Sequence, residues 1–170
     1  MNDIFLLLEL STTQLQRNTD SIFKGRDDRS GDVSISNVEL APSTSDNTLT
    51  VTANATTKDG DYTVKMLFEG VEFFAQQQPG AVSVNDANEL FFMPISKNMA
   101  QVKVTCECLD FYWRFAFYNF NNKALLGQKP KPYTKVPGSN RGPVNPTRTP
   151  GICKHLYALV EYLQQNRIIK

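Results

Sequence analysis

The residues best suited to chemistry in this 170-residue chain are its three cysteines and its one histidine. They form two pairs, Cys106-Glu-Cys108 and Cys153-Lys-His155, which are separated by residues 109–152. Three sulfurs and one imidazole nitrogen are the donors of a tetrahedral Cys₃His zinc site. Because that closed shell leaves no position for water or substrate, the spacing predicts a structural zinc ion. Buried free thiols, a disulfide or an iron–sulfur site are the alternatives.

Two different elements are expected to position these pairs. Between Val102 and Cys108, apolar residues alternate with polar ones, so a strand would direct both sulfurs to one face. After Pro150-Gly151, the apolar spacing predicts an amphipathic helix, carried by Leu156, Leu159, Val160 and Leu163. Cys153 and His155 would then lie in its first turn, where the positive end of the helix dipole favours a thiolate.

The C-x-C…C-x-H pattern of Cys106, Cys108, Cys153 and His155 resembles the SWIM zinc-binding module. In that module the second pair lies at the head of a helix. The resemblance covers about the last seventy residues, and the insert between the pairs is longer here than is usual for that family. It implies a zinc-binding module over residues 101–170, built as a strand, a loop and a helix.

A longer string is similar to a family of uncharacterised tailed-phage proteins thought to be virion components. It comprises Cys106-Glu-Cys-Leu-Asp-Phe-Tyr-Trp-Arg-Phe, then Asn145-Pro, and then Pro150-Gly-Ile-Cys-Lys-His-Leu. This resemblance implies a structural protein of the neck, tail or baseplate, located in the virion and assembled in the host cytoplasm. Its expected partners are neighbouring virion proteins or further copies of the chain.

The formal charge of +1 hides a strong asymmetry along the chain. Residues 1–110 hold sixteen acidic and eight basic side chains, whereas residues 111–170 hold one acidic and ten basic side chains. A basic stretch with interleaved aromatic residues is compatible with three roles: it can bind nucleic acid, bind an acidic protein surface, or form a solvent-exposed face without a partner. The candidate contact residues for a partner or nucleic acid are Arg114, Lys129, Lys131, Lys135, Arg141 and Arg148.

The first hundred residues predict mostly β-structure. Ser11 to Gln14 has the form of a capping box and predicts a short helix, which follows an apolar start at residues 4–10 that suits a buried strand or an inserted arm. Period-two alternation predicts strands at 33–36, 49–53 and 62–68, with a hairpin turn at 59–61. Further short strands are expected at 81–84, 90–95 and 99–108.

The predicted fold class is therefore α+β, mostly β, with an antiparallel sandwich or barrel-like N-terminal part. Three segments are expected: an arm and short helix at 1–32, a β-rich domain at 33–100 and the zinc-binding module at 101–170. Seven aromatic residues between 111 and 120 suit either a helix or a strand. Residues 127–151 hold six of the nine prolines and predict a long irregular loop.

An enzyme is not expected from this sequence. The only histidine and all three cysteines are assigned to the metal, and neither a G-x-S-x-G motif nor a phosphate-binding glycine loop is present. No small-molecule substrate is therefore expected. The apolar start is too short to cross a bilayer, so no membrane partner is expected. The two functional hypotheses are a virion structural protein with a structural zinc ion and a SWIM-like module that binds nucleic acid.

Overall fold

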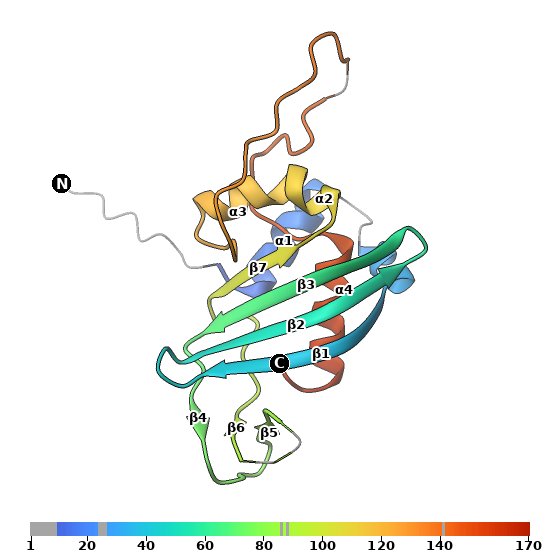
Figure 1. Ribbon diagram of the computed structural model, residues 1–170. Coiled ribbons are helices and arrows are strands. Elements are labelled where there is room, and N and C mark those ends of the chain that lie inside the picture. The colour runs from blue at the N-terminus through green and yellow to red at the C-terminus, as the bar shows by residue number, and fades with distance from the viewer. Residues whose placement is uncertain (1–9, 24–26, 86, 88, 141) are drawn as a thin grey trace, which may run out of the picture.

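A computed structural model describes residues 10–23, 27–85, 87, 89–140 and 142–170. The predicted class is confirmed: the protein is α+β with mostly antiparallel β-structure (Figure 1). The apolar start at 4–10 lies outside the described residues except for its last position. The elements in chain order are α1 (Thr12–Ile22), the 3-10 segment η1 (Asp27–Asp32), β1 (Ser34–Ser43), β2 (Thr48–Thr57), β3 (Gly60–Glu69), β4 (Phe73–Phe74), β5 (Val82–Ser83), β6 (Phe91–Phe92), β7 (Val102–Cys106), α2 (Leu109–Phe111), the π-helical segment η2 (Tyr112–Ala116), α3 (Phe117–Asn121) and α4 (Lys154–Gln165).

Four of the strands form one antiparallel sheet in the order β1-β2-β3-β7. Alternate residues of β2 and β3 are buried on the same face, as the period-two pattern predicted. The register carries this face across to β7, where Met66 pairs with Val104 and Val64 pairs with Cys106. The alternation that buries the valines therefore also turns the Cys106 side chain into the core.

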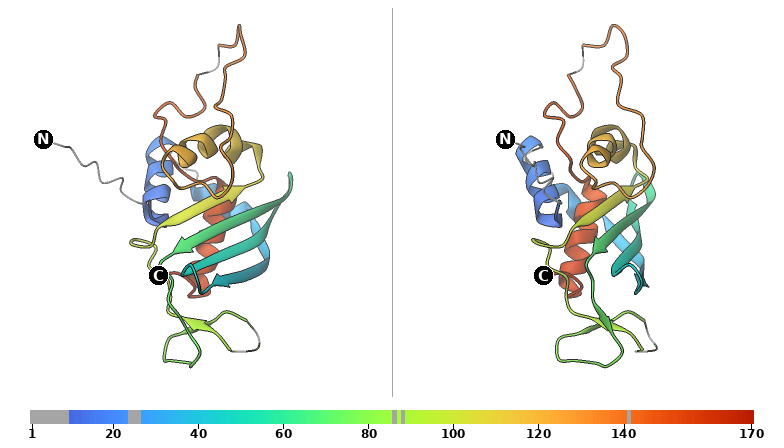
Figure 2. Two further views of the ribbon diagram at one scale, coloured as in Figure 1. Left: turned by 60° about the vertical axis from the view of Figure 1, so that its left-hand side comes forward. Right: turned by 90° about the vertical axis from the view of Figure 1, so that its left-hand side faces the viewer.

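Helix α4 covers the buried face of this sheet and contacts all four strands. Figure 2 shows α4 between the sheet and α1. On the α1 side, the Tyr157 hydroxyl donates hydrogen bonds to the Gln16 carbonyl oxygen at 2.9 Å and to the Asp20 carboxylate. The predicted capping box forms only in part: the Ser11 hydroxyl accepts a hydrogen bond from the Gln14 amide at 3.2 Å, whereas the Gln14 side chain donates to Asn18. The expected segments 33–100 and 101–170 share one hydrophobic core.

The two edges of the sheet differ. Strand β1 is an edge strand, but a bulge between Ser36 and Glu39, with Asn37 at a φ of 50°, interrupts its regular backbone. Such a bulge, together with Pro42, hinders pairing with another chain. At the other edge, the Val104 amide donates to the Ala124 carbonyl, and the Leu126 amide donates to the Val104 carbonyl. The chain that enters the long loop is therefore fixed to β7.

The remaining short strands form a separate three-stranded sheet in the order β4-β6-β5. It lies at the opposite end of the molecule from the long loop (Figure 1). Each strand is only two residues long, shorter than the 81–84 and 90–95 ranges predicted from sequence. Within the described residues, neither sheet closes into a barrel.

The aromatic residues between 111 and 120 are helical, so the helix alternative is correct and the strand alternative is not. Segments α2, η2 and α3 follow one another without a break from Leu109 to Asn121. Phe111 and Phe115 are buried, whereas Tyr112 and Trp113 are more than a third exposed. The wider π-helical turn places the aromatic side chains on two faces, one toward the core and one toward solvent. Residues 127–151 then form the predicted irregular loop, which projects from the body of the protein.

Candidate metal centre

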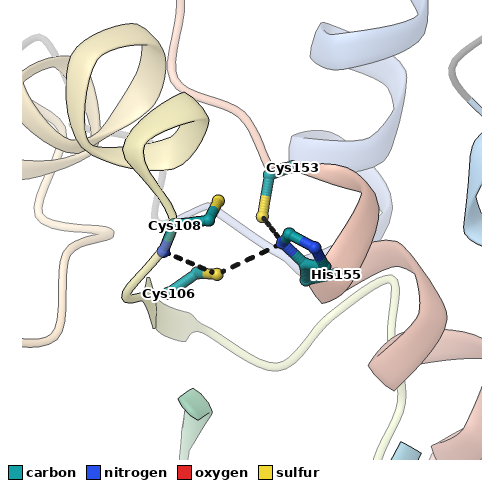
Figure 3. Close-up of side chains that lie close together, drawn as sticks. All are labelled: Cys106, Cys108, Cys153 and His155. Carbon is teal, nitrogen blue, oxygen red and sulfur yellow. Dashed lines mark hydrogen bonds between the residues drawn. The ribbon is translucent and has the colours of Figure 1, made fainter. Parts of the chain in front are cut away.

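The four predicted ligands meet in one buried cluster. One donor atom from each of Cys106, Cys108, Cys153 and His155 lies within 4.8 Å of every other. All four side chains are at most 5% exposed, and no disulfide joins the cysteines. Figure 3 shows the sulfurs and the imidazole converging from two separate segments of the chain. The cluster could hold a metal ion.

The distances inside the cluster match a tetrahedral shell. The Nδ1 atom of His155 lies 3.7 Å from the Cys106 sulfur and 3.9 Å from the Cys153 sulfur. In a tetrahedron with ordinary zinc–sulfur and zinc–nitrogen bond lengths, a sulfur and a nitrogen are about 3.6 Å apart. These two distances are therefore close to the spacing that one shared cation requires, and the remaining pairs of donor atoms lie within 4.8 Å of each other.

The first pair is positioned by the junction between β7 and the following helical segment. The prediction that a strand carries both cysteines is only partly right, because β7 ends at Cys106 and Cys108 is the N-cap of α2. The Cys108 sulfur accepts a hydrogen bond from the Phe111 amide at 3.3 Å, and the Cys106 sulfur accepts one from the Cys108 amide at 3.5 Å. Backbone donors therefore stabilise negative charge on both sulfurs.

The second pair lies at the start of α4, as predicted. Cys153 is the N-cap with extended backbone angles, and His155 follows within the first turn. Since the positive end of a twelve-residue helix lies here, the helix dipole favours a thiolate at Cys153. The Tyr62 ring lies against the imidazole of His155, with ring centroids 4.6 Å apart. The Tyr62 contact helps to hold Nδ1 toward the sulfurs.

The pKa values of the three thiols are shifted in different directions by one another and by burial. A hydrogen bond from the Cys106 thiol, with another from Cys153, holds the pKa of Cys108 far below its ordinary value. The same interaction with Cys108, with burial added, raises the pKa of Cys106, and burial is the main cause of the raised pKa of Cys153. Because a metal binds the thiolate form of cysteine, a bound cation would displace the protons that the raised pKa values favour on Cys106 and Cys153.

Two asparagines hold the long loop next to this cluster, and sequence reasoning did not assign them a role. The buried Asn119 amide donates to the Gly151 carbonyl at 2.9 Å and accepts from the Gly151 amide at 2.8 Å. Asn145 donates to the carbonyl of Arg114 in the π-helical segment at 2.9 Å. Both asparagines are at most 2% exposed. Together they fix the chain shortly before it reaches Cys153.

Gly151 is required at its position by lack of space. An added Cβ would lie 2.5 Å from the Thr19 hydroxyl and 2.7 Å from a carbon of the Phe115 ring. The Thr19 hydroxyl also accepts a hydrogen bond from the Ile152 amide at 2.9 Å. Helix α1, the helical segment 109–121 and the chain that leads to Cys153 are therefore in close contact at Gly151.

The six candidate contact residues do not form one patch. Arg114 is bound into the helix surface, since its Nε lies 3.2 Å from the Asp110 carboxylate and its guanidinium lies over the Phe23 ring. Arg141 lies outside the described residues. The other four are exposed on the projecting loop: Lys129, Lys131, Lys135 and Arg148. The amine of Lys129 lies 5.8 Å from the Phe120 ring centroid, which places a cation beside an exposed aromatic side chain.

Comparisons with protein-family models, with curated proteins and with solved structures gave no match. No helix within the described residues has the length and apolar character needed to cross a bilayer. The described geometry of the cluster and its surroundings therefore provides the basis for the functional argument.

Proposed function

We propose that this protein is a non-enzymatic structural and interaction protein in which a structural zinc ion closes the C-terminal half. The observation that carries the proposal is the buried Cys₃His cluster. Zinc favours this donor set, and four protein ligands leave no coordination position for a substrate. Since zinc binding in such sites contributes about 10 kcal/mol or more, the ion would fix the helical segment 109–121 against α4.

The zinc ion would also set the position of the long loop. The loop begins after the helical segment that Cys108 caps and ends just before Cys153. A rigid base beneath a projecting loop is typical of protein regions that bind partners. In the setting implied by the resemblance to tailed-phage proteins, the partners are neighbouring proteins of the neck, tail or baseplate, and the location is the virion.

Two measurements test this proposal. Elemental analysis of the purified protein should give one zinc ion per chain, and an absence of bound metal in protein produced with zinc would contradict the structural role. Mass spectrometry of purified virions from the phage that encodes the chain should detect it at a fixed copy number relative to known structural proteins. Its absence from the particles would exclude the virion role.

A second candidate function is binding of nucleic acid, as the SWIM resemblance implies. It is favoured by a hollow of about 330 Å³ that is lined in part by Tyr118, Tyr133, Lys135 and Arg148. Aromatic rings can stack on bases while the cations contact phosphates. Binding through these cations should weaken steeply with salt, by about 0.9 log unit per phosphate contact for each log unit of salt on duplex DNA.

Fluorescence anisotropy with labelled single-stranded and duplex DNA, at two salt concentrations, distinguishes this candidate. Lys135→Glu with Arg148→Glu should abolish binding, whereas Lys58→Glu, an exposed lysine in the β2–β3 hairpin, should change it little. If the unmodified protein shows no salt-sensitive binding at micromolar concentration, the nucleic-acid function is excluded.

A further inference from the structure

One hollow on the described surface lies away from the long loop, near the end of β3. It has a volume of about 640 Å³ and lies between the end of β3 and the segment that leads from β6 to β7. Val71 and Ile95 form part of its apolar lining, together with Phe74, Met93 and Met99. Met99 is 87% exposed and Met93 is 43% exposed. Methionine side chains adapt to varied partners, and exposed apolar groups around a hollow are typical of docking sites.

The charged residues that line this hollow are both acidic. They are Glu69, whose carboxylate lies 2.6 Å from the Lys103 amine, and the exposed Glu72. Since Lys103 offsets Glu69, Glu72 contributes most of the unbalanced negative charge. An apolar lining beside an unbalanced carboxylate suits a segment that carries both apolar and cationic side chains.

Residues 129–137 of the loop have this chemistry. Their sequence, Lys-Pro-Lys-Pro-Tyr-Thr-Lys-Val-Pro, contains three lysines and no acidic residue. Lys131 and Lys135 are exposed, and Val136 is 67% exposed. Three prolines restrict the backbone to extended conformations, so the segment loses little conformational entropy when it binds. The segment therefore complements the hollow in charge and in apolar character.

The hollow is lined by residues at the end of β3 and between β6 and β7. The long loop projects from the opposite end of the molecule (Figure 1), so one chain cannot fill its own hollow with its own loop. We propose that residues 129–137 of one copy dock into the hollow around Met93 and Met99 of a second copy. This head-to-tail contact uses different surfaces on the two copies, so it extends into a filament or closes into a ring. The inference rests on the proposed interaction role and adds the identity of one partner, a second copy of this chain.

Two double variants of the full-length zinc-loaded protein test the contact. The hollow variant carries Glu72→Lys and Met99→Lys, and the loop variant carries Lys131→Glu and Val136→Asp. All four positions are exposed, so the fold should be retained, as zinc content and melting temperature will verify. Lys58→Glu is the control for Lys131→Glu, since it makes the same lysine-to-glutamate change at an exposed position outside both surfaces.

Sedimentation velocity over a range of protein concentrations gives the readout. The unmodified protein and Lys58→Glu should self-associate, and association should weaken as salt rises. Each double variant alone should lose self-association about tenfold or more. An equimolar mixture should form a one-to-one dimer that grows no further, because the hollow variant supplies an intact loop and the loop variant supplies an intact hollow.

Three results would overturn the inference: a monomeric unmodified protein at every concentration, double variants that associate like the unmodified protein, or a mixture that stays monomeric. None of these results bears on zinc content or on presence in the virion. If a different virion protein occupies the hollow, the hollow variant will be missing from particles although the unmodified protein is monomeric. The failure of the self-docking inference is therefore distinguishable from the failure of the proposed function.

Discussion

The sheet–α4 core and the metal-centred lobe, defined as residues 106–155, are stabilised in different ways. The core is a continuous apolar cluster in which α4 packs against alternate residues of four strands. The lobe contains an irregular loop of twenty-five residues and depends on a few specific contacts: the Cys₃His cluster, the Asn119–Gly151 hydrogen bonds and the Asn145 side chain. Phe111, Phe115 and Ile152 of the lobe also join the apolar core, but the long loop and the ligand pairs are held mainly by a few polar atoms.

This difference predicts how the stability of each region should respond to a substitution. Loss of one apolar group lowers the stability of the whole cooperative core, because neighbouring side chains share the cost. Loss of one metal ligand, or of the hydrogen bonds made by Asn119 or Asn145, should unfold part of the lobe while the sheet stays folded. Substitutions in the two regions should therefore be separable by where hydrogen exchange accelerates.

The largest effect is expected from Cys153→Ser. The remaining three ligands cannot complete a tetrahedral shell, so the protein should lose its zinc ion and most of a binding free energy of about 10 kcal/mol. Hydrogen exchange should accelerate across residues 107–151 and change least in β2 and β3. A strong chelator added to the unmodified protein should produce the same pattern. Unchanged zinc content and melting temperature in the variant would contradict the metal assignment.

The next effect tests the core. Leu159 is fully buried on α4, and Leu159→Ala should lower the free energy of unfolding by about 2–5 kcal/mol. Denaturant titration should show one cooperative transition, while the folded protein keeps its zinc ion. Leu109→Ala, at a leucine that is 72% exposed in the lobe, is the control and should change stability by only a few tenths of a kcal/mol. Equal effects of the two variants would remove the contrast between the regions.

The Asn119 clamp should contribute less than a core leucine or the metal. Asn119→Ala leaves the buried amide and carbonyl of Gly151 without partners, which should cost about 3 kcal/mol. The loss should appear as faster exchange in 144–152 and as weaker zinc binding in competition with a chelator. Asn121→Ala, at an exposed position two residues away, should leave both measurements unchanged. Normal zinc affinity in the Asn119 variant would show that the Asn119 hydrogen bonds do not contribute to metal binding.

The smallest of the four effects is expected from Gly151→Ala. The new methyl group would overlap the Thr19 hydroxyl and the Phe115 ring, and such overpacking should cost about 2 kcal/mol. Thermal melting should detect the loss. Gly142→Ala is a matched control in the same loop, because no atom lies within 4 Å of its added Cβ. A Gly151 variant as stable as this control would show that α1 and the aromatic helix can separate without cost.

The sequence predicted features that follow from local spacing. Alternation in β2, β3 and β7 fixed which side chains face the core, and the apolar period after Pro150 predicted α4 with Cys153 and His155 at its start. The same alternation could not reveal that the strand stops at Cys106, since a helix cap at Cys108 places its sulfur in the same cluster. The local pattern therefore identified the four residues of the cluster, but it predicted the secondary structure correctly for only some of them.

Contacts between distant segments lay beyond such reasoning. Asn119 and Gly151 are thirty-two residues apart, and neither residue type signals the other. The aromatic run lacks a pattern that separates helix from strand, so its packing on Phe23 and on the core decided the outcome. The hollow between the end of β3 and the segment that leads from β6 to β7 is lined mostly by residues of connecting segments, which carry almost no periodic signal.

The two fixed ends of the long loop have a consequence for how this protein can change. One end is tied to β7 through Val104, and the other is clamped by Asn119 just before the second ligand pair. Asn145 adds a third attachment, so only residues 127–140 lie clear of all three, and exchanging them should leave the donor atoms of the cluster in place. Sequence changes in this stretch should therefore alter the exposed surface of the loop without altering any of the four candidate ligands.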